Sequence, residues 1–411
     1  MAEIFPTFTA AERDRRWRET REKMAQAGIA ALAMPASGGH WDQFFANQRY
    51  LSQLGGNQYR TAMVFPLDGD PTLVIPGIGE AVHWREISWA DDIRGSDGHR
   101  YGKVLAARLQ ELKLEAETIG VPLLESPAHA GESPIPSGAL NALREALPRA
   151  KFVDASALMD EQRAIKSDEE IAMIERASAI AERSIFMLGY HVRAGMPQTE
   201  ALAILEGAML KAGCELSNQV LWECSPKPGR TWWHAMHIPI EQGDVLQNEL
   251  EAKIAGYSAR EVHPICVGKP KPRVYEMFDL SAKTFDKALP LLKPGAQVDE
   301  VVQMVREAGE GTPYRTSLTS YGTGMAQEEL GASADAAGPA VYRERQVMIF
   351  KPVVRAEDGL GINFCSTVVV TPEGGRRLSR RPLELMLTSR SLMSAYVKEP
   401  SKEPTAPWLR V

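Results

Sequence analysis

The chain has 411 residues, of which 44% are hydrophobic and 24% are charged, a composition typical of a soluble globular protein. This length is too great for one ordinary core, so two domains are expected. The formal net charge of −6 argues against a nucleic-acid-binding protein, which usually has a basic face. No apolar run is long enough to span a bilayer, so no membrane partner is expected either.

The cysteines and the first residues indicate the compartment. The four cysteines show no Cys-x-x-Cys spacing and are expected to be free thiols: Cys214, Cys224, Cys266 and Cys365. The first residues have no apolar stretch after a basic one, so no signal peptide is expected. Together these features predict a cytoplasmic protein.

The first part of the sequence alternates strand-like and helical segments. Strands are expected at 30–34, 61–65, 72–75 and 118–122, and helices at 10–27, 104–112 and 137–147. The segment 67–71 contains the Asp, Gly and Pro of a turn between two of these strands. This alternation predicts an α/β domain, to which we assign residues 1–155.

The second part opens with a helix start signal. Ser167 can cap a helix, and Glu170 stands three residues later as the returning arm of a capping box. Further helices are expected at 198–212, 275–292 and 298–308, and strands at 245–254, 257–267, 346–354 and 361–371. We therefore predict an α+β domain over 156–385. A tail over 386–411 is predicted to be mobile or to pack on a partner subunit.

Short motifs recur in order along almost the whole chain. They are found at 50–51, 164–171, 243–245, 256–257, 267–268, 292–295 (Leu-Lys-Pro-Gly), 322–324 (Gly-Thr-Gly), 349–352 and 367–371. In this order and spacing they resemble the creatinase and aminopeptidase P family. The resemblance implies a creatinase-like α/β N-terminal domain, an α+β pita-bread C-terminal domain that is catalytic, and a homodimer.

The peptidases of this family hold two metal ions with two Asp, one His and two Glu. The matching positions of this chain carry Glu249, Arg260, Tyr321, Lys351 and Cys365. Only one of the five ligand positions still carries a carboxylate. Two of the replacements are cations that would repel a divalent ion. We therefore expect no metal and no other cofactor, and not a metallopeptidase.

Creatinase is a metal-free member of the family that uses a histidine and glutamates on a small guanidino acid. This chain does not copy those residues. Trp232 and Glu328 stand at two family histidine positions, and Val262 stands at a creatinase glutamate position. Ectoine hydrolases are also metal-free and carry an acid at the position of Glu249. The chain thus resembles a separate metal-free branch.

The replaced positions are expected to face one cavity. Strand alternation adds Glu251 to the face of Glu249. In a functional site, Lys351 and Arg260 hold an anionic substrate group, Glu249 is the general base or nucleophile, and Tyr321 is a proton donor. The alternative is an ion-pair network that fills the former metal cavity.

Other residues are candidates for the substrate pocket. Three tryptophans in the segment that lines the substrate site in this family would suit a flat ring or a cation: Trp222, Trp232 and Trp233. Further candidates, each with an ordinary structural role as the alternative, are His234, His237, Glu261, His263 and Cys365. In the smaller domain, Trp41, Tyr59 and Arg60 stand where the family's dimer partner reaches the neighbouring site, and Arg60 is a candidate for a substrate carboxylate.

Three hypotheses about function follow. The first, which the family analogies favour, is a metal-independent hydrolase of a small non-peptide C–N bond in a catabolic pathway. The second, which the tryptophans favour, is a metal-independent lyase of an aromatic, lignin-derived carboxylic acid. The third is a non-catalytic scaffold dimer. In the first two, the partner is a small molecule with an anionic group.

Overall fold

The computed structural model describes residues 6–37, 42–56, 59–125, 132–216, 220–229, 234–326, 328–329 and 340–388. Trp41, Trp232, Trp233 and the tail beyond residue 388 lie outside the described residues. Within the described part of the chain, none of the helices combines the length and the apolar composition that a membrane span requires.

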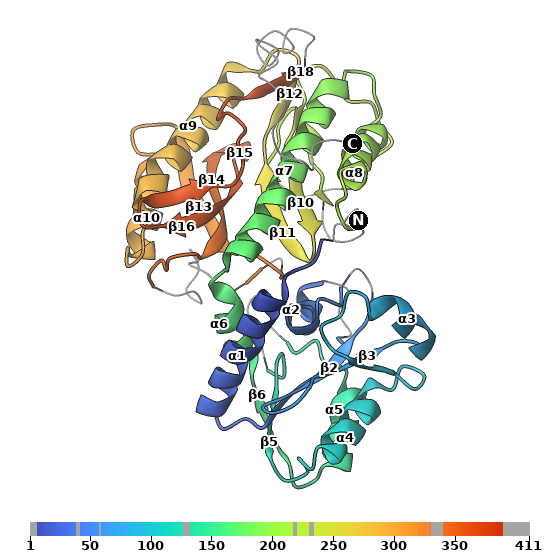
Figure 1. Cartoon of the computed structure of the whole chain (residues 1–411). Helices are drawn as coiled ribbons and strands as arrows, with labels where there is room; N and C mark the ends of the chain where they lie inside the picture. The colour runs from blue at the N-terminus through green and yellow to red at the C-terminus, as the bar shows by residue number, and fades with distance from the viewer. Residues whose placement is uncertain are drawn as a thin grey trace.

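The N-terminal domain is built on a mixed sheet with the strand order β4-β3-β2-β1-β5-β6 (Figure 1). Its strands are β1 (Ala31–Met34), β2 (Ala62–Pro66), β3 (Thr72–Ile75), β4 (Asp92–Gly95), β5 (Thr118–Val121) and β6 (Lys151–Asp154). Its helices are α1 (Ala10–Gln26), η1 (Asp42–Phe45), α2 (Ala46–Ser52), η2 (Ile78–Glu80), α3 (Ala81–Trp84), α4 (Tyr101–Glu111) and α5 (Ser137–Ala146). Leu105, Leu109 and Leu143 of α4 and α5 pack with Val64 and Val74 of the sheet, which confirms an α/β domain.

Helix α6 (Ser156–Ala164) leads into α7 (Asp168–His191), the long helix of the second domain. The predicted capping box is present, because Glu170 N–H donates to Ser167 Oγ and Ser167 N–H donates to Glu170 Oε2. Helix α7 buries Ile174, Ala177 and Ala181 against β10 and β11. This stripe follows the helical period that the sequence predicts.

The C-terminal domain contains strands in three sheets, with orders β11-β10-β7, β18-β12-β9-β8 and β13-β14-β16-β17, the last with β15 on β14. The strands are β7 (Val220–Leu221), β8 (Cys224–Ser225), β9 (Val245–Leu246), β10 (Glu249–Ile254), β11 (Tyr257–Val262), β12 (Ile265–Val267), β13 (Tyr314–Gly322), β14 (Val347–Ala356), β15 (Gly361–Asn363), β16 (Ser366–Thr371), β17 (Gly374–Arg377) and β18 (Met386–Thr388). The helices are α7, α8 (Gln198–Lys211), α9 (Pro272–Ala288), η3 (Leu289–Leu291) and α10 (Val298–Glu307).

Three predicted strands are each divided into two in the structure. The chain leaves regular pairing at 247–248, at 263–264 and at 364–365, and the two halves of 245–254 and of 257–267 join different sheets. Strand β13 was not predicted, and the first residues of the predicted tail form β18, which pairs with β12. The structure is thus the expected α+β domain with more and shorter strands.

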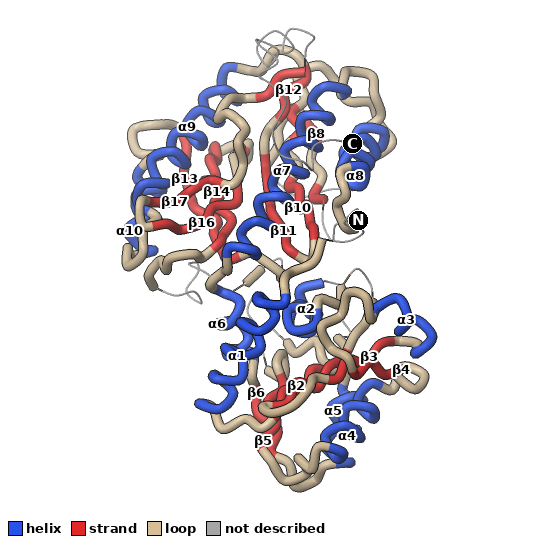
Figure 2. The backbone as a smooth tube through the Cα atoms, in the orientation of Figure 1, coloured by secondary structure: helices blue, strands red, loops and turns tan. Residues whose placement is uncertain are grey.

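Helices cover the outer sides of this domain and leave two sheet faces turned inward. Helix α7 lies against β10 and β11, and α8 packs on α7; α9 lies against β14 and β15, and α10 lies against β13 (Figures 1 and 2). Leu250 and Ala252 of β10 pack in the core under α7, and Phe350 and Val354 of β14 pack in the core under α9. Because side chains alternate along a strand, the residues between them face the opposite way, into the space between the sheets.

Candidate active site

The strand register brings the predicted catalytic positions into two rows across the inner faces. Glu249 pairs with Val262, and Val262 forms an isolated bridge to Cys365, which joins the two sheets. The pairing of β14 with β16, continued by one residue, sets Cys365 opposite Lys351. The first row is therefore Glu249, Val262, Cys365 and Lys351. By the same registers the second row is Glu251, Arg260, Thr367, Ile349 and Tyr321.

A buried ion-pair cluster connects these rows. Lys351 Nζ lies 2.6 Å from Glu249 Oε2, and Arg260 Nη1 lies 3.0 Å from Glu249 Oε1. Arg260 Nη2 donates to Glu251 Oε2 at 3.2 Å, and the Arg260 guanidinium carbon lies 5.3 Å from the centre of the Tyr321 ring. All but Tyr321 are buried, and Tyr321 is half-buried. The structure thus brings together Glu249, Glu251, Arg260, Lys351 and Tyr321.

The charges in the cluster determine its protonation. Burial alone would raise the pKa of Glu249, but the Lys351 and Arg260 charges outweigh burial and hold this pKa below its usual value. Burial would lower the pKa of Arg260, but Glu249 and then Glu251 raise it. Glu249 is therefore a stable carboxylate as long as both cations face it.

An apolar floor lies beneath these ions. Val262, Ile349 and Cys365 are fully buried and pack together, with Tyr321 against them. Burial raises the pKa of the Cys365 thiol, which makes this side chain a neutral part of the floor and not a nucleophile. Lys351 and Glu249 reach each other above this floor.

Two predicted pocket residues lie on the other side of β11 or beyond its end. Glu261 alternates with Arg260 and faces α7, where its carboxylate accepts from Ser178 Oγ at 3.0 Å and from Arg381 Nη2 at 3.0 Å. Burial raises the Glu261 pKa to about 7. His263 Nε2 donates to the Glu384 carbonyl at 2.7 Å, and burial holds the His263 pKa well below its usual value. The structure does not bring either residue to the cluster.

The segment before β9 gives a similar correction. Trp222 is 1% exposed and donates its indole N–H to Gln198 Oε1 at 3.1 Å, so it is a core residue and not a pocket wall. His237 is exposed and its Nδ1 lies 3.0 Å from Thr199 Oγ1, and His234 is also exposed. In this chain neither histidine is a member of the buried cluster.

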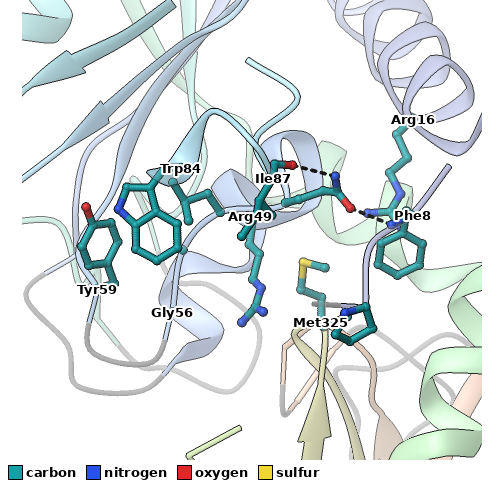
Figure 3. Close-up of a pocket in the computed structure, with 13 residues that line it drawn as sticks. Phe8, Arg16, Arg49, Gly56, Tyr59, Trp84, Ile87 and Met325 are labelled. Carbon is teal, nitrogen blue, oxygen red and sulfur yellow. Dashed lines mark hydrogen bonds between the residues drawn. The ribbon is translucent and has the colours of Figure 1, made fainter. Parts of the chain in front are cut away.

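The N-terminal domain candidates lie outside the cluster of their own chain. Tyr59 donates its hydroxyl hydrogen to Glu80, and Arg60 is exposed while its carbonyl accepts from Tyr101. Tyr59 lines a cavity of about 240 Å³ between the domains, together with Phe8, Trp84, Ala255 and Met325. Figure 3 shows Tyr59 and Trp84 on one side of this cavity and Phe8 and Met325 on the other. As far as the described residues define its lining, none of the cluster side chains reaches it.

Two charged residues near the cluster were missed. Lys253 follows Glu249 and Glu251 at the same spacing of two residues and is 1% exposed. The strand alternation that places the two glutamates on one face also predicts this lysine on that face. Glu328 was named only as a replaced histidine, but its charge helps to raise the pKa of Arg260. Lys253 thus lies on the same face of β10 as the two glutamates, and Glu328 lies close enough to act on Arg260.

A second buried ion pair fixes the loop that follows β13. Glu329 Oε2 lies 2.6 Å from Lys166 Nζ, and Glu329 Oε1 accepts from the Ala326 N–H at 2.9 Å. The Glu329 N–H donates back to the Gly322 carbonyl at 2.8 Å. These contacts attach the loop that carries Glu328 to the start of the second domain. They explain why Lys166 is buried.

No group of three or more His, Cys, Asp or Glu in the described ranges has an arrangement that could hold a metal ion. At the cluster the reason is direct, because Arg260 and Lys351 occupy positions among the carboxylates. The cluster thus presents two cations, Arg260 and Lys351, to the space between the sheets.

Comparisons with known proteins agree with the motifs. The family model of the creatinase/prolidase N-terminal domain matches residues 16–165, and that of metallopeptidase family M24 matches residues 172–372. The Xaa-Pro dipeptidase of Pyrococcus horikoshii is 25% identical over 260 residues, 62% of this chain and 74% of the relative. The creatinase of a Bacillus species is 25% identical over 316 residues, 74% and 72% of the two chains.

Solved structures show the same fold. The X-Pro aminopeptidase of Thermotoga maritima superposes with a TM-score of 0.76 at 20% identity, over 90% of this chain and 99% of that chain. The prolidase of Pyrococcus horikoshii gives 0.73 at 21% identity, over 90% and 100%. The N-terminal α/β domain and the C-terminal pita-bread domain are thereby confirmed.

Proposed function

The chain belongs to the creatinase and M24 metallopeptidase family, and we propose that it is a metal-independent hydrolase acting on a C–N bond of a small non-peptide substrate with an anionic group. Its relatives include Xaa-Pro dipeptidases and a creatinase, which are hydrolytic enzymes. The observation that carries the proposal is the pairing of Lys351 and Arg260 with one carboxylate, Glu249, over an apolar floor.

The residues at the family's metal positions do not fit a metal ion. Divalent ions need several neutral or anionic donors at bonding distance. Here a guanidinium and an ammonium already neutralise Glu249, and Tyr321 and Cys365 complete the set. No step of the reaction is therefore assigned to a metal.

The cations are well placed to bind a substrate anion. Arg260 comes from one sheet and Lys351 from the other, so an anionic group between the sheets meets both. Binding of that group draws positive charge away from Glu249, and the Glu249 pKa rises towards the range of a useful base. Substrate binding and base activation are then the same event.

The remaining steps of the proposed reaction give one role each to Glu249 and Tyr321. Glu249 removes a proton from a water molecule, the resulting hydroxide attacks the carbon of the C–N bond, and that bond breaks. Tyr321, which stacks under Arg260, gives its hydroxyl proton to the leaving nitrogen. The proton taken by Glu249 returns through solvent to Tyr321, which balances the cycle. Loss of the Glu249 carboxylate in Glu249→Gln should abolish turnover while the fold is kept.

A thermal-shift screen tests this proposal. The protein is screened against small guanidino and amino acids, ectoines and aromatic carboxylic acids. A ligand present at a hundred times its Kd stabilises the folded state by about 2.7 kcal/mol. We expect stabilisation by small amino compounds, its loss in Lys351→Met, and its retention in Lys283→Met, in which an exposed lysine of α9 is changed.

Each other outcome has a definite meaning. Stabilisation by aromatic acids alone would favour the lyase. Silence across all classes would contradict the hydrolase and favour a scaffold. Equal ligand binding by Lys351→Met and the unchanged protein would remove Lys351 from the binding site.

A further inference from the structure

Asn363, at the end of β15, faces the same space as the ion cluster. Its neighbours Ile362 and Phe364 both pack in the core under α9, so the side chain between them points to the inner face. Asn363 pairs with Val353, in the register that sets Cys365 opposite Lys351. It is therefore a diagonal neighbour of Lys351, at the spacing of about 7–8 Å typical of such pairs.

The Asn363 carboxamide oxygen has no hydrogen-bond partner among the described residues, although the side chain is only 5% exposed. Gln247, the amide side chain that bonds to this segment, is already used. Gln247 Oε1 accepts from the Asn363 backbone N–H at 3.0 Å, and Gln247 Nε2 donates to the Gly361 carbonyl at 3.3 Å. A buried acceptor without a donor is costly and rare in native structures.

We propose that Asn363 Oδ1 accepts a hydrogen bond from an N–H group of the substrate, beside the anionic group held by Lys351. The inference rests on the proposed function, because Lys351 must bind the anion. It narrows the substrate to small acids with an N–H near the anionic group, such as amides, ureas or guanidines of amino acids. Two features then define the substrate: a negative charge that pairs with Lys351 and Arg260, and an N–H group that donates to Asn363 Oδ1.

Discrimination follows from the unpaired acceptor. A substrate analogue with a methyl group in place of the N–H would leave Asn363 Oδ1 buried against carbon. Sites built to hydrogen-bond a substrate reject such analogues more strongly than apolar pockets reject a change of size. The preference for the N–H should therefore be carried by Asn363 and not by the charged residues.

A matched pair of probes tests this inference by calorimetry: N-acetylglycine, and N-acetylsarcosine, in which an N-methyl group replaces the N–H. Both keep the carboxylate. The unchanged protein should bind N-acetylglycine roughly tenfold more tightly. Asn363→Leu, which has a similar volume and no acceptor, should bind both probes alike, and Asn363→Ala repeats the test if the leucine is not accommodated. Asn141→Leu, at an exposed asparagine of α5, should keep the preference.

The other outcomes separate the two proposals. Lys351→Met should lose both probes, since each carries the anion. A preference that survives in Asn363→Leu and Asn363→Ala, or equal binding by the unchanged protein, would overturn the role of Asn363 and leave the anion site standing. If the unchanged protein binds neither probe, the anion site fails, and the assignment of Asn363 fails with it.

Discussion

Replacing Lys351 by Met should destabilise the protein, because it removes one of the two cations that neutralise a buried carboxylate. Glu249 and Lys351 have side chains 5% and 10% exposed and are joined at 2.6 Å. Breaking a buried pair by removing one partner costs about 3–5 kcal/mol. Arg260 remains 3.0 Å from Glu249, so we expect about 2–3 kcal/mol. Methionine keeps the apolar stem, which limits the loss of packing.

The dependence on pH has a defined sign. In the unchanged protein the Glu249 pKa is lowered, so its contribution to stability is present above the unfolded-state pKa and is lost as pH falls through the folded-state pKa. In Lys351→Met, Arg260 is the only one of the two cations left to oppose the effect of burial, so the Glu249 pKa rises. The deficit in stability should therefore shrink on acidification, because a protonated Glu249 needs no counter-charge.

A double-mutant cycle measures the pair itself. Lys351→Met, Glu249→Gln and the double variant are unfolded in urea and followed by circular dichroism, and the coupling should be about 1–3 kcal/mol. The control is Lys283–Asp279 on α9, also joined at 2.6 Å but with side chains 67% and 42% exposed. Its coupling should be undetectable. A Lys351–Glu249 coupling as small as that of the control would refute a desolvated cluster.

Three further predictions concern residues around the cluster. Burial raises the pKa of Glu261 to about 7 in the folded state, above its unfolded-state pKa of about 4.3. Raising the pH from 4 to 8 should therefore cost the protein roughly 3–4 kcal/mol of stability relative to Glu261→Gln, measured by urea unfolding at each pH. Trp222→Phe should lose about 1–3 kcal/mol of stability in the same assay, because Gln198 Oε1 is left unpaired, and should bind ligands unchanged. Metal analysis of the purified protein should find no stoichiometric divalent ion, and EDTA should leave the unfolding temperature unchanged; one tightly bound ion per chain would contradict the proposed role of Arg260 and Lys351.

Sequence motifs located the cluster because it lies on regular strands. Glu249 and Glu251 share a face by alternation, and the hairpin turn at Ala255 and Gly256, both at positive φ, fixes which residue of β11 they oppose. The same rule should have removed Glu261 from the pocket, since it is adjacent to Arg260 and must face the other way.

Other features could not be predicted without the tertiary structure. Trp222 follows a strand of two residues, too short to reveal which side is buried. Strand β13 alternates buried with exposed or half-buried positions, but its polar residues, such as Thr316 and Ser320, hide that period in the sequence. The position of Asn363 depends on neighbours that pack in the core and on an acceptor that has no donor among the described residues, and the sequence reveals neither.

The distribution of charge supports the proposal that this cluster binds a substrate and does not merely fill a cavity. Replacing a buried ion-pair network by apolar side chains of similar volume is often neutral or stabilising, so packing alone does not require these ions. The anions Glu249 and Glu251 stand on one strand, whereas the cations come from β11 and β14, on two different sheets. A substrate anion between the sheets competes with Glu249 for both cations, and whatever positive charge it takes is lost to the Glu249 carboxylate. In the proposed function, the two cations that hold the Glu249 pKa low in the free protein are therefore also the groups that an anionic substrate engages.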